Sequence, residues 1–352
     1  MRDGGSISVA RYVVVGPPTH GVVVHALRLA AADATLGRAL VRVPTATSGV
    51  VPEGLLDAVP RGGAALLHVT DRLFGPTPEA AARAIQALGT RTSLALALHD
   101  VPQPAEGGDW YARRRDCYGQ LAGVAPRLVV ASAFEADLLA RCAAPEDRDV
   151  VARRTRVIPL PVERRHVPAH ARAARPGGAT ADLAVLGFLY PGKGVEDAID
   201  VAAALTTSAR EVTVTNYGAV AEGHADDAES LARYAAERGV RFRLTGYLSD
   251  EELLEAVLRA DVPLAPHRHI SASGSVNTWV EAGRRPLVRR SPYIDELAGR
   301  LPGVVTAADD LGAAVASALA DPASTWLGDE VEVGPSWAAA AEAYADLLRE
   351  LR

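Results

Sequence analysis

The chain has 352 residues, of which 49% are hydrophobic, and carries a formal net charge of −6. This length allows two domains with separate cores, and the composition excludes a disordered or fibrous protein. No apolar stretch is long enough to cross a bilayer and no apolar signal region follows Met1, so we expect a cytoplasmic protein. The acidic charge and the lack of interleaved aromatic and basic residues argue against nucleic-acid binding.

The charge is unevenly distributed. Residues 1–175 hold 22 arginines and 16 acidic residues, a formal charge of +6, whereas the remainder holds 15 basic and 27 acidic residues, a charge of −12. A basic first part favours an anionic acceptor or peripheral binding to an anionic membrane surface. A solvated helix face around Arg113–Arg115 is the alternative that we prefer. The two cysteines, Cys117 and Cys142, lack metal-ligand spacing, and we predict no metal site.

The first half of the chain alternates short Val- and Leu-rich runs with Ala-rich stretches of helical periodicity. This alternation is typical of a parallel sheet covered by helices. The first strand ends at the turn Gly16–Pro18, and a helix is predicted from Val22 to Ala32. The predicted strands of this half are Tyr12–Val15, Leu66–Val69, Leu94–Leu98, Leu128–Val130 and Val157–Leu160.

A domain boundary is predicted between Pro161 and Asp182, where the sequence is rich in Pro, Arg and Ala and has no sustained apolar period. We therefore expect an N-terminal domain with its linker over residues 1–175, a second domain over 176–335 and a C-terminal helix over 336–352. The predicted strands of the second half are Leu183–Leu186, Glu211–Thr215, Arg241–Leu244, Val262–Ala265, Pro286–Val288 and Val304–Val305, and its predicted helices are Val195–Leu205, Asp227–Arg238 and Ser336–Arg352.

Lysine occurs once, at Lys193, while the other basic residues are all arginine. A chain that uses arginine everywhere else keeps lysine where a compact point charge fits and a wide guanidinium does not, such as a socket around one phosphate oxygen. Chance survival of one lysine on a solvated loop is the alternative.

The surroundings of Lys193 favour an anion site. The spacing from Gly187 through Gly192 to Lys193 matches the start of a Walker A loop, but Gly194 stands where a hydroxyl would hold magnesium. An ATPase or kinase is therefore disfavoured. A strand, a glycine-rich turn, a lysine and a helix start at Val195 still form a good anion site.

The run Val185–Gly194 resembles the strand and loop that open the nucleotide-sugar-binding domain of family 4 glycosyltransferases, which have the GT-B fold. Residues 244–253 resemble the base-binding turn of that family, 260–266 the strand before its donor loop, and 280–288 the segment with its ribose-binding glutamate. In the first half, 98–102 and 157–162 also match familiar segments. The resemblance implies an α/β chain of two Rossmann-like domains facing across a cleft, with the C-terminal helix crossing back to the N-terminal domain.

The resemblance also implies an activity. The protein would move a sugar from a nucleotide-diphosphate donor to an acceptor hydroxyl, with retention, without a metal and without a cofactor beyond the donor. The acceptor stays open among a glycan, a lipid-linked molecule and a small natural product. His99 and Asp100 are the predicted catalytic residues at the cleft. The residues predicted to bind the donor are Gly21, Gly187, Lys193, Tyr247, Ser273, Gly274, Ser275 and Glu281.

Each donor residue has a predicted role. Lys193 and the backbone amides near Gly274 and Ser275 neutralise the diphosphate, because small residues before a helix let amides approach phosphate oxygens closely. The resemblance assigns the ribose hydroxyls to Glu281 and the base to the backbone near Tyr247. It also assigns Gly21 to the close approach of the first strand–helix loop to the diphosphate.

Two departures from the family keep other interpretations open. Phe188 stands where the family commonly has arginine, and Ser273 stands where it tends to have glutamate. A non-catalytic partner of an active transferase and a nucleotide-sugar epimerase are therefore the alternatives. At the level of residues, Ser273 and Ser275 are also suited to capping a helix without any ligand, and His99 to bonding Asp100 in a purely structural turn.

Overall fold

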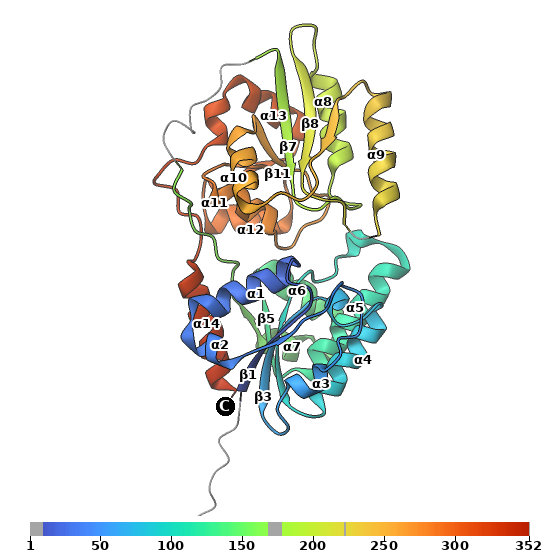
Figure 1. Cartoon of the computed structure of the whole chain (residues 1–352), viewed down its shortest axis with the longest axis vertical. Helices are drawn as coiled ribbons and strands as arrows, with labels where there is room; N and C mark the ends of the chain where they lie inside the picture. The colour runs from blue at the N-terminus through green and yellow to red at the C-terminus, as the bar shows by residue number, and fades with distance from the viewer. Residues whose placement is uncertain (1–9, 168–177, 222, 352) are drawn as a thin grey trace, which may run out of the picture. The chain divides into compact units, whose positions relative to one another are not determined.

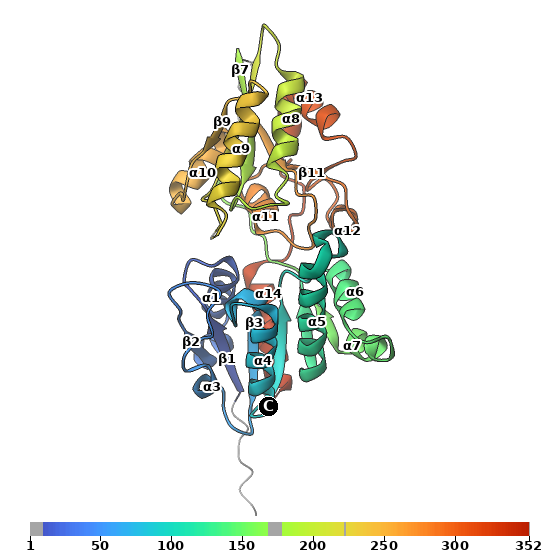
Figure 2. The same cartoon turned by 90° about the vertical axis from the view of Figure 1, so that its right-hand side faces the viewer.

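The chain forms two compact units in the computed structural model, which describes residues 10–167, 178–221 and 223–351. Unit 1 comprises Met1–Pro161 and Pro335–Arg352, and unit 2 comprises Val162–Gly334. Each unit has its own six-stranded parallel sheet covered by helices on both faces (Figures 1 and 2). The two Rossmann-like domains that the sequence resemblance implies are therefore confirmed.

The sheet of unit 1 has the strand order β2-β1-β3-β4-β5-β6. Its central strands are apolar on both faces, and every residue of β3 is buried, as a parallel sheet between two helical layers requires. All carboxyl ends of the strands lie at one edge of the sheet. The strands are β1 (Ala10–Val15), β2 (Leu40–Val43), β3 (Ala64–Val69), β4 (Ser93–Leu98), β5 (Arg127–Val130) and β6 (Thr155–Val157).

Helices α1 and α14 pack against each other and against β1, which makes the last helix of the chain part of unit 1. Ala341, Ala345 and Leu348 of α14 are fully buried in the core of that unit. The return of the C-terminal helix is therefore confirmed. The helices of unit 1 are α1 (Gly21–Ala32), α2 (Ala34–Ala39), α3 (Leu55–Ala58), α4 (Pro78–Gly89), α5 (Gly108–Val124), α6 (Ala133–Cys142), α7 (Arg148–Arg154) and α14 (Trp337–Glu350).

The sheet of unit 2 has the order β12-β11-β10-β7-β8-β9, so that β7 lies between β10 and β8. Consequently the loop after β7 has the carboxyl ends of β8 and β10 as its neighbours. The strands are β7 (Thr180–Leu186), β8 (Glu211–Tyr217), β9 (Phe242–Leu244), β10 (Val262–Ala265), β11 (Leu287–Arg289) and β12 (Thr306–Ala308).

Alternate residues of β7 supply two separate cores. Leu183 and Val185 pack with α8 and α13, whereas Ala184 and Leu186 pack with α10 and α11. The helices of unit 2 are α8 (Val195–Leu205), α9 (Ala225–Glu237), α10 (Asp250–Arg259), α11 (Gly274–Glu281), α12 (Pro292–Arg300) and α13 (Leu311–Ala320). Of the helices described here, none is both long and apolar enough to span a membrane.

Two predicted strands are displaced. The strand predicted at Val157–Leu160 is β6, which ends at Val157, because Pro159 and Pro161 have no N–H to continue the ladder. The strand predicted at Val304–Val305 starts later, at Thr306, because Val304 closes a turn by donating to the carbonyl of Leu301. The two valines are buried, which explains the misleading apolar signal.

The two units divide after Pro161, at the start of the interval in which the boundary was predicted. The predicted position at residue 175 lies within 168–177, outside the described residues. The segment before it, residues 162–167, belongs to unit 2. Arg164 holds it there, because its Nη2 donates to the carbonyls of Gly328 at 2.6 Å and Val331 at 2.7 Å.

Candidate functional site

Lys193 is buried at the carboxyl edge of the unit 2 sheet. Its side chain follows β7 and is only 3% exposed. Its Nζ lies 3.1 Å from Nε2 of His267, the second residue after β10. Burial lowers the pKa of Lys193 to about 7. The pKa of His267 is also lowered, mainly by burial and secondarily by the nearby charge of Lys193. His267 is therefore neutral, and its Nε2 accepts a hydrogen bond from the Lys193 ammonium.

No carboxylate balances this cation. Among the described residues, none of the acidic side chains forms an ion pair with Lys193, and burial is the sole cause of its lowered pKa. An unpaired buried ammonium is costly, so the site favours an incoming anion. This is the property that distinguishes Lys193 from a lysine on a solvated loop.

Gly187 and Ser275 complete the surroundings of the ammonium. A Cβ on Gly187 would lie 3.0 Å from Lys193 Nζ and 3.6 Å from Ser275 Cβ, and the backbone there has φ +105°. Gly187 therefore brings the β7 turn into contact with both the lysine and the N-terminus of α11. Three residues that the sequence analysis assigned to the donor, Gly187, Lys193 and Ser275, are brought together.

The Lys193 loop is interlocked with the segment after β10. Gly194 caps α8 with φ +82°, and a Cβ there would lie 2.1 Å from the carbonyl oxygen of Pro266. The backbone N–H of Arg268 donates to the carbonyl of Gly192 at 3.0 Å. Gly194, which argues against a Walker A loop, is thus the residue that lets the two segments touch.

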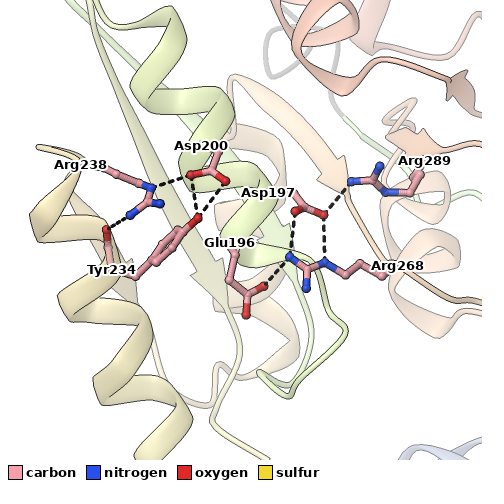
Figure 3. Close-up of polar contacts among 7 residues, drawn as sticks. All are labelled: Glu196, Asp197, Asp200, Tyr234, Arg238, Arg268 and Arg289. Atoms are coloured by element: carbon pink, nitrogen blue, oxygen red, sulfur yellow. Dashed lines mark hydrogen bonds and ion pairs between the residues drawn. The ribbon is translucent and has the colours of Figure 1, made fainter. Parts of the chain in front are cut away.

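Helix α8 forms ion pairs with the segment after β10 and with the end of β11 (Figure 3). Asp197 accepts from Arg268 at 2.9 Å and from Arg289 at 2.7 Å. One turn later, Asp200 bonds Arg238 on the side of α9. The Asp197–Arg268 pair therefore attaches the segment that carries His267 to the helix that follows Lys193, whereas the pair with Arg289 attaches the end of β11 to that helix. The Asp200 pair contacts neither.

The segment 271–275 forms an ordinary helix cap at the start of α11. The Oγ of Ser273 accepts from the N–H of Val276 at 3.2 Å and lies 3.0 Å from the Oγ of Ser275. Gly274 is exposed, and a Cβ there would meet nothing within 4 Å. The capping role is confirmed for Ser273, and donor binding by Ser273, Gly274 and Ser275 stays a prediction.

The remaining donor residues of unit 2 lie at different depths. Glu281 is buried at the end of α11, with its Oε2 3.9 Å from Nε of Arg165. Tyr247 is 74% exposed after β9, and Phe188 is 49% exposed in the loop after β7. The ribose role of Glu281 and the base role of the backbone near Tyr247 stay predictions. Phe188 places an aromatic ring where the family arginine would stand.

His99 lies at the corresponding edge of the unit 1 sheet, directly after β4. Its Nε2 lies 2.9 Å from Nδ1 of His68, and His68 Nε2 lies 2.8 Å from the hydroxyl of Tyr12. Burial lowers the pKa of His99 to about 4 and that of His68 well below its ordinary value. The His99 ring therefore contacts the ring of His68.

Asp100 has a distinctive backbone conformation. Its φ is 53°, the only positive φ of a non-glycine residue in the described part of the chain. Its carbonyl accepts from Arg114 Nη2 at 2.6 Å, and the carbonyl of His99 accepts from the Tyr118 hydroxyl at 2.5 Å. These bonds hold the turn in place. Aspartate tolerates this region better than most residues, and such positions cluster at functional sites.

His20 and Gly21 begin α1 at the same edge. His20 Nδ1 accepts from the N–H of Val22 at 3.2 Å, which caps the helix. Gly21 is exposed and a Cβ there would meet nothing within 4 Å, so its backbone is open to a ligand. Its contact with the diphosphate stays a prediction. The described residues contain no group of three or more His, Cys, Asp or Glu side chains placed to hold a metal ion.

Sequence reasoning missed two histidines. His267 follows the segment 260–266 by one residue, and its position just after a predicted strand was the available signal. His68 lies within the predicted strand Leu66–Val69, where it was given no role. Both contact a residue that was predicted, Lys193 or His99, from a neighbouring strand.

Comparisons with known proteins give a fold. No model of a protein family matches the sequence, and no curated protein matches it. Among solved structures, Anabaena Alr3699/HepE with UDP-glucose has a TM-score of 0.64 at 15% identity, covering 97% of this chain and 96% of that one. Sucrose-phosphate synthase from Thermosynechococcus elongatus has a TM-score of 0.63 at 14% identity, covering 98% and 94%.

A third structure, described as trehalose-6-phosphate from E. coli with UDP-2-fluoro glucose, has a TM-score of 0.61 at 11% identity and covers 97% of this chain and 96% of that one. The similarity extends over nearly the whole of each chain. At these identities it shows the fold, which is GT-B with two Rossmann-like domains, as the sequence resemblance implied.

Proposed function

We propose that this protein is a glycosyltransferase that moves a hexosyl group from a nucleotide-diphosphate sugar to an acceptor hydroxyl. The observation that carries the proposal is Lys193, a buried ammonium with no carboxylate partner among the residues that the structure describes. It lies beside Gly187 and the N-terminus of α11. A cation, a close-approach glycine and a helix N-terminus are the three elements of a diphosphate site.

The physical reason is charge balance. Breaking the bond between sugar and diphosphate leaves negative charge on the leaving group, and fixed positive charge stabilises that transition state. Lys193 supplies a full charge and the first N–H groups of α11 supply partial charges. The bound diphosphate in turn removes the cost of the unpaired ammonium. The proposal assigns this neutralisation to the protein without a metal.

A uridine diphosphate sugar is the donor that we propose. Alr3699/HepE binds UDP-glucose, and its structural similarity to this protein covers nearly all of this chain. In the proposed complex Glu281 holds the ribose hydroxyls and the backbone near Tyr247 contacts the base. Membership of family 4 and retention at the anomeric carbon belong to the same proposal, with the leaving phosphate accepting the proton of the acceptor hydroxyl.

Thermal unfolding with a nucleotide panel tests the proposal. UDP and UDP-glucose are expected to raise Tm in proportion to their affinity, because a ligand that binds only the folded state stabilises it. Uridine is the control that lacks phosphates and is expected to shift Tm little. Release of UDP from UDP-glucose with a panel of acceptors then measures transfer.

A non-catalytic partner of an active transferase is the second candidate. It is favoured by Ser273, whose hydroxyl caps α11 where the family tends to have glutamate, and by the exposed Phe188. The same panel separates the two functions. No shift of Tm with any nucleoside diphosphate favours the non-catalytic partner, whereas binding followed by UDP release supports the transferase.

A further inference from the structure

Three side chains form a continuous hydrogen-bonded chain across one face of the unit 1 sheet. Strands β1, β3 and β4 are neighbours, Tyr12 pairs with Leu66, and His68 pairs with Ala97. Because side chains alternate along a strand, Tyr12, His68 and His99 project from the same face. Helices α1 and α14 cover that face.

The Tyr12 hydroxyl has two polar neighbours, a carbonyl oxygen and a histidine nitrogen. The Tyr12 hydroxyl lies 3.1 Å from the carbonyl oxygen of Ala26 on α1. A carbonyl oxygen only accepts, so the single proton of the hydroxyl points to Ala26. With its proton there, the Tyr12 oxygen is the acceptor for His68, and we assign the proton of the 2.8 Å contact to Nε2 of His68.

The second hydrogen bond follows from a count of protons. Burial lowers the pKa of His68 well below its ordinary value, so the ring is neutral and carries one proton, which Nε2 uses. His68 Nδ1 therefore has a lone pair and accepts from Nε2–H of His99 at 2.9 Å. Burial also lowers the pKa of His99 to about 4, so its Nδ1 keeps a lone pair as well.

Aromatic packing holds the rings in these orientations. The centroid of His25 lies 5.5 Å from that of His68 and 5.7 Å from that of His99, and the Tyr344 ring lies 5.0 Å from His68. These neighbours come from α1 and α14, which enclose the two imidazoles. The packing thus restrains both imidazole rings in the orientation that their hydrogen bonds require.

We propose that Tyr12 and His68 are positioning residues that fix His99 in the tautomer protonated at Nε2, so that His99 Nδ1 accepts a hydrogen bond from a hydroxyl of the sugar substrate. This inference rests on the proposed function for the encounter with a sugar. The tautomer itself does not depend on it.

Long-range ¹H–¹⁵N correlation spectra of the full chain, labelled at histidine, test the tautomer directly, because a protonated and a bare ring nitrogen have well separated ¹⁵N shifts. His99→Gln identifies the His99 signals. The wild-type protein is expected to show His99 protonated at Nε2. Protonation at Nδ1 in the wild type overturns the proposal without recourse to any other variant.

Variants test the relay, by which we mean the control of the His99 tautomer by Tyr12 through His68. Tyr12→Phe removes the acceptor for His68, and His99 is expected to show a mixture of tautomers. His68→Gln retains one donor and one acceptor and is expected to keep the wild-type tautomer. Tyr118→Phe is the matched control, because it removes a bond to the His99 carbonyl and not to the ring. An unchanged tautomer in natively folded Tyr12→Phe contradicts the relay.

Turnover of UDP-glucose tests the substrate contact. Tyr12→Phe is expected to lower kcat roughly three- to tenfold, the worth of about one hydrogen bond, whereas His68→Gln, which keeps the tautomer, is expected to lose less. An unchanged kcat beside a mixed tautomer overturns the contact with the substrate. If the wild-type protein neither binds nor turns over UDP-glucose, the proposed function fails, and the tautomer spectra still decide the relay.

Discussion

The two units place different buried pairs of basic side chains at the carboxyl edges of their sheets. In unit 2, Lys193 lies 3.1 Å from His267; in unit 1, His68 lies 2.9 Å from His99. The imidazole pair can be neutral and satisfied by its own hydrogen bonds. The lysine pair cannot carry its charge cheaply unless an anion arrives. The comparison indicates that unit 2 is built to attract charge and unit 1 to present a neutral acceptor of hydrogen bonds.

The surroundings follow the same division. Gly187 and the N-terminus of α11 lie beside Lys193, and the helix N-terminus adds positive potential. Aromatic rings from α1 and α14 surround His68, which excludes ligand and fixes orientation. The carboxyl edge of the unit 2 sheet is therefore characterised by positive charge, and that of the unit 1 sheet by close aromatic packing.

The largest expected effect comes from filling the space in unit 2. Gly194→Ala is expected to lower the free energy of unfolding by about 3 kcal/mol or more, because the new Cβ adds a collision with Pro266 to the strain of a positive φ. Urea denaturation measures it. Gly239→Ala is the control, with φ +67° and nothing within 4 Å of the new Cβ. It is expected to cost only about 1 kcal/mol. Equal losses would contradict the interlocked loops.

The next effect sharpens the difference in charge. The pKa of Lys193 is lowered to about 7, and a diphosphate binds the protonated form, so UDP binding takes up a proton above pH 7. The Kd for UDP is expected to rise roughly tenfold per pH unit between pH 7.5 and 8.5. Calorimetry in two buffers of different ionisation enthalpy measures the uptake. Lys193→Arg, which stays protonated, is expected to abolish the pH dependence.

The same pKa predicts the pH dependence of stability without ligand. Because the folded pKa of Lys193 lies below its ordinary value of 10.5, the unfolded chain binds more protons between about pH 7 and 10.5. The Lys193 contribution to the free energy of unfolding therefore rises with pH in that window. A contribution that falls with pH, judged against Lys193→Met, would show that the ammonium is stabilised in the fold.

The smallest expected effect concerns the ion pairs between α8 and its neighbouring segments in unit 2. Asp197→Asn weakens the pairs with Arg268 and Arg289 and is expected to cost about 1 kcal/mol of stability and to raise the Kd for UDP about twofold. Asp200→Asn on the same helix is the control, because its partner Arg238 follows α9 and does not belong to the segment after β10. Its Kd for UDP is expected to match the wild type. A matching effect on Kd in both variants would argue against a specific role for Asp197.

Much of the fold could be predicted because parallel strands are continuous apolar runs. Val262–Ala265 was placed to the residue, and so was the helix Val195–Leu205. The misplaced strands have local causes: prolines that end β6 early, and buried valines that belong to a turn before β12. Burial and strand pairing give the same apolar signal in a sequence, so pattern alone does not separate them.

The site could be predicted only in part. Lys193 was found because it is the single lysine and follows a glycine-rich turn. His267 was missed because its contact arises from the pairing of β10 with β7, 74 residues apart in sequence at the point of contact. Likewise the pairing of β3 with β4 brings His68 to His99. Such contacts depend on strand order, which the pattern of residues in a single sequence does not reveal.

Calorimetric titration of UDP into the wild-type protein and Lys193→Ala tests the central claim most directly. The account predicts that the wild type binds UDP and that the variant binds it roughly ten- to a hundredfold more weakly, the loss expected for one charged hydrogen bond. Lys193→Met, which keeps the length of the side chain, is expected to lose as much, because the loss comes from the charge. Equal affinity for UDP in the wild type and both variants would contradict the claim that Lys193 binds the diphosphate of a sugar donor.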